Sequence, residues 1–79
     1  MARVLLFGRL ADIAGWRDRD FDCTSVRQLT ARLTQDDAEL GAALAGPGVQ
    51  VAVDQVLHRG DARLGSATEV AYLPPMSGG

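Results

Sequence analysis

The 79-residue chain has no lysine, only one cysteine and no long apolar run. Without lysine, the α-amino group is the one amine that could act as a nucleophile. Cys23 stands alone, so the chain can form no internal disulfide and has no cysteine pair to hold a metal. No apolar stretch approaches the roughly 20 residues that cross a bilayer, and the N-terminus lacks a signal-like region. These absences predict a cytoplasmic protein with no metal site and no membrane partner, held together by packing alone.

The charge pattern excludes another class of partner. Eight arginines are interleaved with ten acidic residues, for a net charge of -2. No basic stripe is present that could neutralise a run of phosphates, so nucleic acid is not expected as a partner. Apolar residues make up 47% of the chain and charged residues 23%, which is typical of a globular protein. A chain of this length predicts a single domain over residues 1–79.

Periodicity and punctuation predict the order of the elements. In chain order we expect a strand at 3–7, a short helical turn at 10–14 closed by Gly15, a polar edge strand at 16–23, a helix from Ser25 to about Gln35, a further helical turn within 36–44, a turn at 46–48, a strand at 49–53, a hairpin turn at 54–55, a short strand at 56–58 and a last strand at 69–73.

The helix that begins at Ser25 has the clearest signal. Ser25 and Gln28 have the spacing of a capping box. Val26, Leu29 and Leu33 then fall on one helical face, which should pack on the core.

This order predicts an α+β domain, with a mixed sheet of four to five strands wrapped on one main helix. The β-grasp, or ubiquitin-like, fold fits it. A ferredoxin-like fold is the rival, but it needs a second full helix between the last strands. Residues 58–68 contain two glycines and no helical stripe, which disfavours the rival.

The last six residues, 74–79, have a composition that opposes regular structure. Pro74 and Pro75 cannot donate to a sheet ladder and favour an extended path, while Gly78 and Gly79 make a thin end. Six extended residues reach at most about 20 Å. We therefore expect a projecting tail that can enter the active site of a partner.

The C-terminal carboxylate of Gly79 is the candidate reactive group. A carboxylate is a poor electrophile until it is activated, most simply as a mixed anhydride with AMP. A sulfur nucleophile can then displace AMP and leave a thiocarboxylate, which can give its sulfur to an electrophilic substrate. Cys23 is interpreted as a half-buried strand-end residue and His58 as a solvated side chain, and residues 59–61 (RGD) as a turn.

Three segments carry a resemblance to a known family. Residues 4–15 (VLLFGRLADIAG), 25–29 (SVRQL) and 69–79 (EVAYLPPMSGG) closely resemble the MoaD-like small subunits of molybdopterin synthase. The resemblance spans essentially the whole chain. It implies a β-grasp sulfur carrier, not catalytic alone, that holds no permanent cofactor.

The resemblance also implies a reaction sequence and two partners. A MoeB-like E1 enzyme would use ATP to adenylate Gly79, which then becomes a thiocarboxylate. A MoaE-like large subunit, paired with this subunit in a heterotetramer, would transfer the sulfur to the cyclic pyranopterin precursor of molybdopterin. The implied contacts with partners come from six positions: Phe7, Leu57, Leu73, Pro75, Met76 and Ser77.

Strand alternation bears on the same surface. If Val4, Leu6, Val70 and Tyr72 face the helix, then Leu5, Phe7, Ala71 and Leu73 face away from it. An exposed apolar patch on that outer face is expected to be a docking site.

Other functions remain open. The chain could be a sulfur carrier for cysteine or thiamine synthesis, although Pro74 and Pro75 argue against the thiamine pathway, or a protein modifier that joins Gly79 to target lysines. Two departures from the family pattern lie in turns. Residues 65–69 read GSATE where DGDE is common, and Asp54 stands where Asn is common. They put only the local loop geometry in question.

Overall fold

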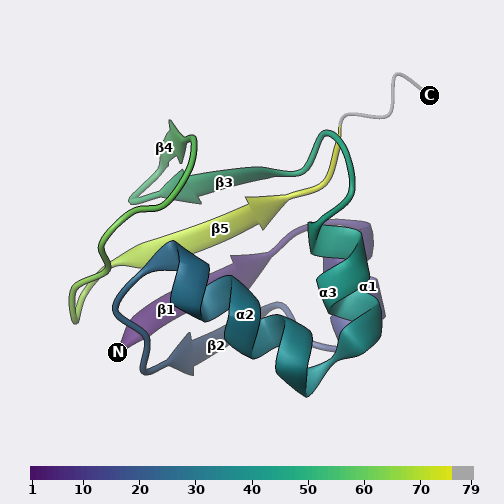
Figure 1. The fold of residues 1–79 in the computed structure, drawn as a ribbon, viewed down its shortest axis with the longest axis horizontal. Coiled ribbons are helices and arrows are strands. Elements are labelled where there is room, and N and C mark those ends of the chain that lie inside the picture. The colour runs from purple at the N-terminus through teal and green to yellow at the C-terminus, as the bar shows by residue number, and fades with distance from the viewer. Residues whose placement is uncertain (76–79) are drawn as a thin grey trace.

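The computed structural model describes residues 1–75, and within them the chain forms five strands and three helices (Figure 1). The elements are β1 (Ala2–Leu6), α1 (Arg9–Ala14), β2 (Asp18–Phe21), α2 (Val26–Asp36), α3 (Ala38–Leu44), β3 (Gln50–Val53), β4 (Val56–His58) and β5 (Glu69–Leu73). The strands form one sheet in the order β2-β1-β5-β3-β4. The two central strands, β1 and β5, are parallel, and the other neighbours are antiparallel. This is the mixed α+β arrangement that the sequence predicted.

The core lies between one face of the sheet and the helices. Val4, Leu6, Val70 and Tyr72 all point into it and are at most 2% exposed, so the condition on which Leu5, Phe7, Ala71 and Leu73 were expected to face outward is met. Leu29 of α2 is fully buried against them. The one hydroxyl among these side chains is not left unpaired, because Tyr72 Oη lies 2.7 Å from Thr30 Oγ1. Burial raises the pKa of Tyr72 to about 12, so this phenol stays protonated at neutral pH.

The N-terminus of α2 is capped more fully than the sequence pattern predicted. Ser25 Oγ accepts from the Gln28 amide at 3.1 Å, as expected for a capping box. The Gln28 side chain, however, accepts from the amide of Thr24, at 2.7 Å, and not from that of Ser25. Asp61, from the loop after β4, accepts from the Arg27 amide at 2.8 Å. This last contact joins residues 34 positions apart and could not be read from local spacing.

A second helix follows α2, where the sequence predicted a further turn. Asp37 interrupts the helix because its backbone is extended, with φ of -151° and ψ of 100°. Its amide donates to Leu33 O at the end of α2, and its carboxylate accepts from the amides of Glu39 and Leu40 at the start of α3. Asp37 therefore ends one helix and begins the next, so α2, the longest helix, is followed directly by the shorter α3.

The edge strand β2 is shorter than predicted, four residues in place of eight, but it does lie at the edge of the sheet. Its packing relies on aromatic contacts. The Trp16 and Phe21 rings lie 5.7 Å apart, and the guanidinium of Arg19 sits 4.9 Å from the Phe21 ring. Cys23, just beyond β2, is 7% exposed, so it is more deeply buried than expected, and burial raises the pKa of its thiol.

Between β4 and β5 the chain forms no helix, and these residues all lie within the part that the structure describes. This absence excludes the ferredoxin-like arrangement. Across residues 1–75, no helix is long and apolar enough to cross a membrane.

Candidate functional site

The outer face of the sheet, turned away from α2, carries an apolar row across four strands. The register places Leu5, Ala71, Ala52 and Leu57 side by side, from β1 through β5 and β3 to β4. Leu57 is 59% exposed, whereas Ala71 and Ala52 are each only 8% exposed. Ala71 thus faces outward as predicted but adds little to an exposed patch, because neighbouring strands on both sides cover its single methyl group.

Phe7 and Leu73 extend this face at the end where β1 and β5 finish. The Phe7 amide donates to Tyr72 O at 3.2 Å, which continues the β1–β5 ladder beyond Leu6. Phe7 follows the buried Leu6, so alternation places it on the outer face, where it is 44% exposed. Leu73 is half-buried. The structure therefore brings Phe7, Leu57 and Leu73 to one face, and their contact with a partner stays a prediction.

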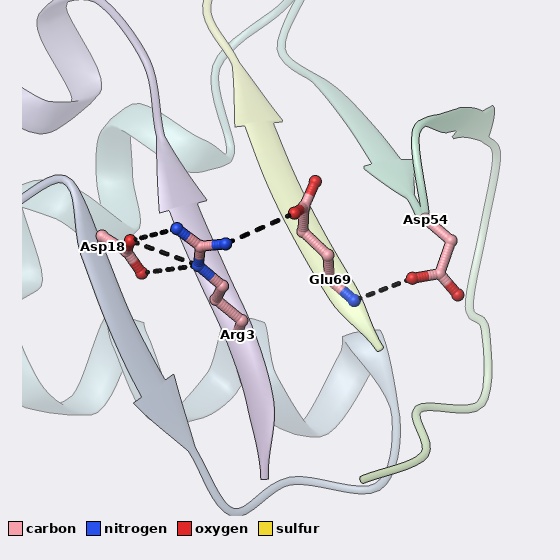
Figure 2. A network of polar contacts seen from close by, with 4 residues as sticks. All are labelled: Arg3, Asp18, Asp54 and Glu69. Atoms are coloured by element: carbon pink, nitrogen blue, oxygen red, sulfur yellow. Dashed lines mark hydrogen bonds and ion pairs between the residues drawn. The ribbon is translucent and has the colours of Figure 1, made fainter. Parts of the chain in front are cut away.

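The opposite end of this face is polar (Figure 2). Arg3 Nη2 lies 2.6 Å from Asp18 Oδ2, and Arg3 Nη1 lies 3.9 Å from Glu69 Oε1. The Glu69 amide donates to Asp54 Oδ1 at 2.9 Å, which ties β5 to the hairpin turn. The hydrogen bond from Arg3 lowers the pKa of Asp18. These charged groups pair with one another across the sheet. The exposed apolar surface of this face therefore lies nearer the end where the tail begins.

The tail begins between two glycines, which we call the glycine seat: Gly8, after β1, and Gly48, before β3. Both have positive φ, 55° and 83°. A Cβ on Gly8 would lie 3.0 Å from Pro74 Cγ, and a Cβ on Gly48 would lie 2.7 Å from Pro75 Cβ. Each glycine is therefore required both by its backbone angle and by the close approach of a proline. Figure 1 shows that both loops lie at the end of the sheet where β5 finishes.

The glycine seat was not predicted from the sequence. Gly8 directly follows the strand predicted at 3–7 and Gly48 lies in the turn predicted at 46–48, but the contacts with Pro74 and Pro75 join residues far apart in the chain. The available signal was the presence of glycine on both sides of Pro47, since a turn alone needs only one. A hollow of about 260 Å³ lies beside Pro75, between α1 and the loop from α3 to β3.

The remaining predicted residues are placed as follows. Cys23 is buried, and the exposed His58 has its Nε2 3.2 Å from Asp61 O, in keeping with a solvated side chain. The Asp61 carboxylate of the RGD tripeptide is used within the domain, because it accepts from the amides of Arg27 and Ala62. The four tail positions Met76, Ser77, Gly78 and Gly79 lie outside the described residues.

The turns are well formed at both places where the sequence departs from the family pattern. Asp54 and Gln55 have φ of 49° and 70°, as a two-residue hairpin turn requires. In the loop before β5, the Gly65 amide donates to Thr68 Oγ1 at 2.8 Å, and the Thr68 amide donates back to Gly65 O at 3.3 Å. The unusual residues therefore do not disturb the register of β5.

Comparison with known structures establishes the fold. The chain is similar to the small archaeal modifier protein SAMP1 from Methanosarcina acetivorans, with a TM-score of 0.87 and 21% identity over 99% of this chain and 95% of that one. It is similar to SAMP1 from Haloferax volcanii, with a TM-score of 0.81 and 24% identity over 99% and 98% of the two chains. A third similar structure, from Pyrococcus furiosus, is provisionally named molybdopterin converting factor subunit 1, with a TM-score of 0.81 and 21% identity over 95% and 97%. The predicted β-grasp, ubiquitin-like fold is confirmed.

Sequence comparison identifies the family. A search of curated proteins gives no match. The model of the ThiS family, in contrast, matches residues 4–79, which is nearly the whole chain and includes both the glycine seat and the C-terminal glycines. The chain belongs to the ThiS family.

Proposed function

We propose that this protein is the sulfur-carrier small subunit of a molybdopterin synthase. In this function Gly79 is adenylated, converted to a thiocarboxylate and used to donate sulfur to the cyclic pyranopterin precursor. The observation that carries the proposal is the position of Phe7 and Leu73, apolar and partly exposed, at the end of the sheet where Pro74 and Pro75 begin the tail. The tail of this chain would be directed along the surface of a partner that binds there.

Family membership supports the coarser part of this proposal, a ThiS- or MoaD-type sulfur carrier or a ubiquitin-like modifier. The molybdopterin pathway rests on more specific features. These are the Pro-Pro-Met-Ser-Gly-Gly ending and the resemblance of residues 4–15 to MoaD-like small subunits. The provisional name of the Pyrococcus furiosus structure agrees with that pathway.

The domain contributes binding and orientation, and its partners contribute catalysis. Phe7 and Leu57 together offer an apolar surface to a MoaE-like large subunit, and burying such a side chain is worth about 1.5–3 kcal/mol. A MoeB-like enzyme would transfer AMP from ATP to the Gly79 carboxylate and release pyrophosphate. A sulfur donor would then displace AMP from the carbonyl carbon. The tail must enter both active sites, which its glycine end allows because it has no side chains.

Intact-mass measurement tests this proposal. The protein is incubated with ATP, a sulfur source and a MoeB-like enzyme, and we expect a mass increase equal to the replacement of one oxygen by sulfur. The thiocarboxylated product is then mixed with a MoaE-like subunit and the cyclic precursor, and molybdopterin should form. A carrier with one residue added after Gly79 is the matched control, since the reacting carbon moves by about 3.5 Å. Equal product from the extended carrier, shown by mass to be unprocessed, would exclude Gly79 as the sulfur-bearing residue.

Protein modification is the second candidate function, favoured by the fold shared with two proteins named small archaeal modifier protein 1. The same incubation separates the two functions when target proteins are present. A modifier gives conjugates whose masses equal target plus carrier minus water. Because this chain has no lysine, its own side chains offer no amine for a conjugate between two copies.

A further inference from the structure

We propose that Gly48 is a positioning residue: by leaving room for Pro75, it sets the direction in which the tail leaves the sheet. Gly8 has the same relation to Pro74. The inference rests on the proposed function in one respect, that the segment after Pro75 must reach the active sites of other proteins.

The contact at Gly48 is too close for any side chain. A Cβ there would lie 2.7 Å from Pro75 Cβ, 3.5 Å from its Cα and 3.6 Å from its Cγ. Optimal carbon separations are about 3.5–4.0 Å, so the first of these contacts is strongly repulsive. Pro75 cannot relieve it by turning about its own N–Cα bond, because the pyrrolidine ring holds φ near -65°. Either the tail or the loop before β3 would have to move.

A movement at Pro75 matters because the reacting atom belongs to Gly79, four residues further along the chain. Four residues follow Pro75 in the sequence, and their greatest length is about 14 Å. A change of about 15° in the direction of the chain at Pro75 shifts the region that Gly79 can reach by up to about 4 Å. Displacements of about 1 Å can lower the rate of a well-positioned reaction by a hundredfold. The domain surface that docks on a partner would be unchanged.

The chain offers a matched control for backbone strain. Gly60 has φ of 76°, close to the 83° of Gly48, but a Cβ built on Gly60 meets no heavy atom of the described residues within 4 Å. Alanine at either position therefore suffers the same kind of unfavourable φ. Only alanine at position 48 also meets a proline of the tail.

The experiment measures adenylation of Gly79 by a MoeB-like enzyme, followed as pyrophosphate release, in five proteins. These are the wild type, Gly48→Ala, Gly60→Ala, Pro75→Gly and the double variant Gly48→Ala with Pro75→Gly. We expect Gly48→Ala to lower kcat by about tenfold with KM for the carrier within about twofold, because docking is intact and the tail is misdirected. Gly60→Ala should keep the wild-type kcat while its melting temperature falls about as much as that of Gly48→Ala.

Removing the Pro75 ring and its Cβ should remove the effect of alanine at 48. In the Pro75→Gly background, Gly48→Ala should change kcat by less than about twofold, as expected when two residues act through one contact. Pro75→Gly alone should lower kcat without lowering the melting temperature, because Pro75 is exposed. This single variant also serves as the test should Gly48→Ala fail to fold.

Three results would overturn the proposal. They are an unchanged kcat in Gly48→Ala, an equal loss of kcat in Gly60→Ala, and a loss in Gly48→Ala that persists in the Pro75→Gly background. A wild type that the MoeB-like enzyme does not adenylate is a different result, because it counts against the proposed function and leaves the contact between Gly48 and Pro75 untested by this assay. In that event the contact between Gly48 and Pro75 is tested without any partner, by the nuclear Overhauser effect between Gly48 Hα and Pro75 Hβ. We expect it in the wild type, and its absence would disprove the seat.

Discussion

The two faces of the sheet are built from the same strands but have opposite properties. On the inner face Val4, Val70 and Tyr72 are at most 1% exposed and contact the helices. On the outer face Phe7 and Leu57 are 44% and 59% exposed, and Leu5 and Leu73 are half-buried. The inner face gives the domain its stability, whereas the apolar part of the outer face has no cover within residues 1–75. Substitutions on the two faces should therefore be separable into effects on folding and effects on binding.

The largest effect is expected on the inner side. Leu29→Ala should lower the free energy of unfolding by about 2–5 kcal/mol, because Leu29 is fully buried and a small domain cannot fill the cavity. Urea unfolding measures this change. Leu57→Ala is the control on the outer face, where loss of an exposed side chain should cost less than about 1 kcal/mol. Equal costs at the two positions would mean that the faces do not differ as described.

The matching prediction for the outer face concerns binding. Phe7→Asp should weaken binding to the large subunit by about 2–4 kcal/mol, because a carboxylate would be buried without a partner. The melting temperature should stay close to that of the wild type, since Phe7 lies outside the core. Isothermal titration calorimetry and a thermal melt together test this. An unfolded variant would place Phe7 in the core, and an unchanged affinity would remove it from the interface.

The helical layer that covers the inner face provides a third prediction. Gly41 lies in α3, where alanine would normally be favourable, but a Cβ at this position would lie 2.5 Å from Thr34 Cγ2. We therefore expect Gly41→Ala to destabilise the domain by about 1–3 kcal/mol through overpacking of α2 against α3. Chemical denaturation gives the value. Stabilisation in place of destabilisation would show that the two helices can separate at little cost.

The smallest effect concerns the charged groups at the margins of the two faces. Backbone hydrogen bonding, mainly from the Arg27 amide, lowers the pKa of Asp61, and the hydrogen bond from Arg3 lowers the pKa of Asp18. A carboxyl whose pKa is lower in the folded state stabilises the fold above its unfolded pKa of about 3.9, and that contribution is lost as pH falls through the folded pKa. The melting temperature should therefore drop below about pH 4.

Two variants test the two carboxyls separately. Asp61→Asn keeps an acceptor for the Arg27 amide but cannot titrate, so its melting temperature should fall less steeply in acid than that of the wild type. Asp18→Asn should do the same for the outer face, where 0.5 M salt should weaken the contribution because the Arg3–Asp18 pair is exposed. Acid profiles identical to that of the wild type would show that neither carboxyl is coupled to folding.

Much of the fold followed from local patterns in the sequence. Alternation in β1 and β5 correctly grouped Val4, Leu6, Val70 and Tyr72 on one face, because successive side chains of a strand must point to opposite faces. The spacing of Ser25 and Gln28 located the start of α2, since a cap acts within a single turn.

Tertiary structure decided what depended on distant neighbours. Ala71 is buried on the outer face because of the strands beside it, and Asp61 reaches the Arg27 amide from the loop after β4. The seat that Gly48 makes for Pro75 belongs to the same class. The sequence by itself determined which residue types could serve at these positions, a small one, an acceptor and a glycine. Which partner each of these residues contacts is determined only in the folded chain, because packing depends on distances between segments that no local pattern encodes.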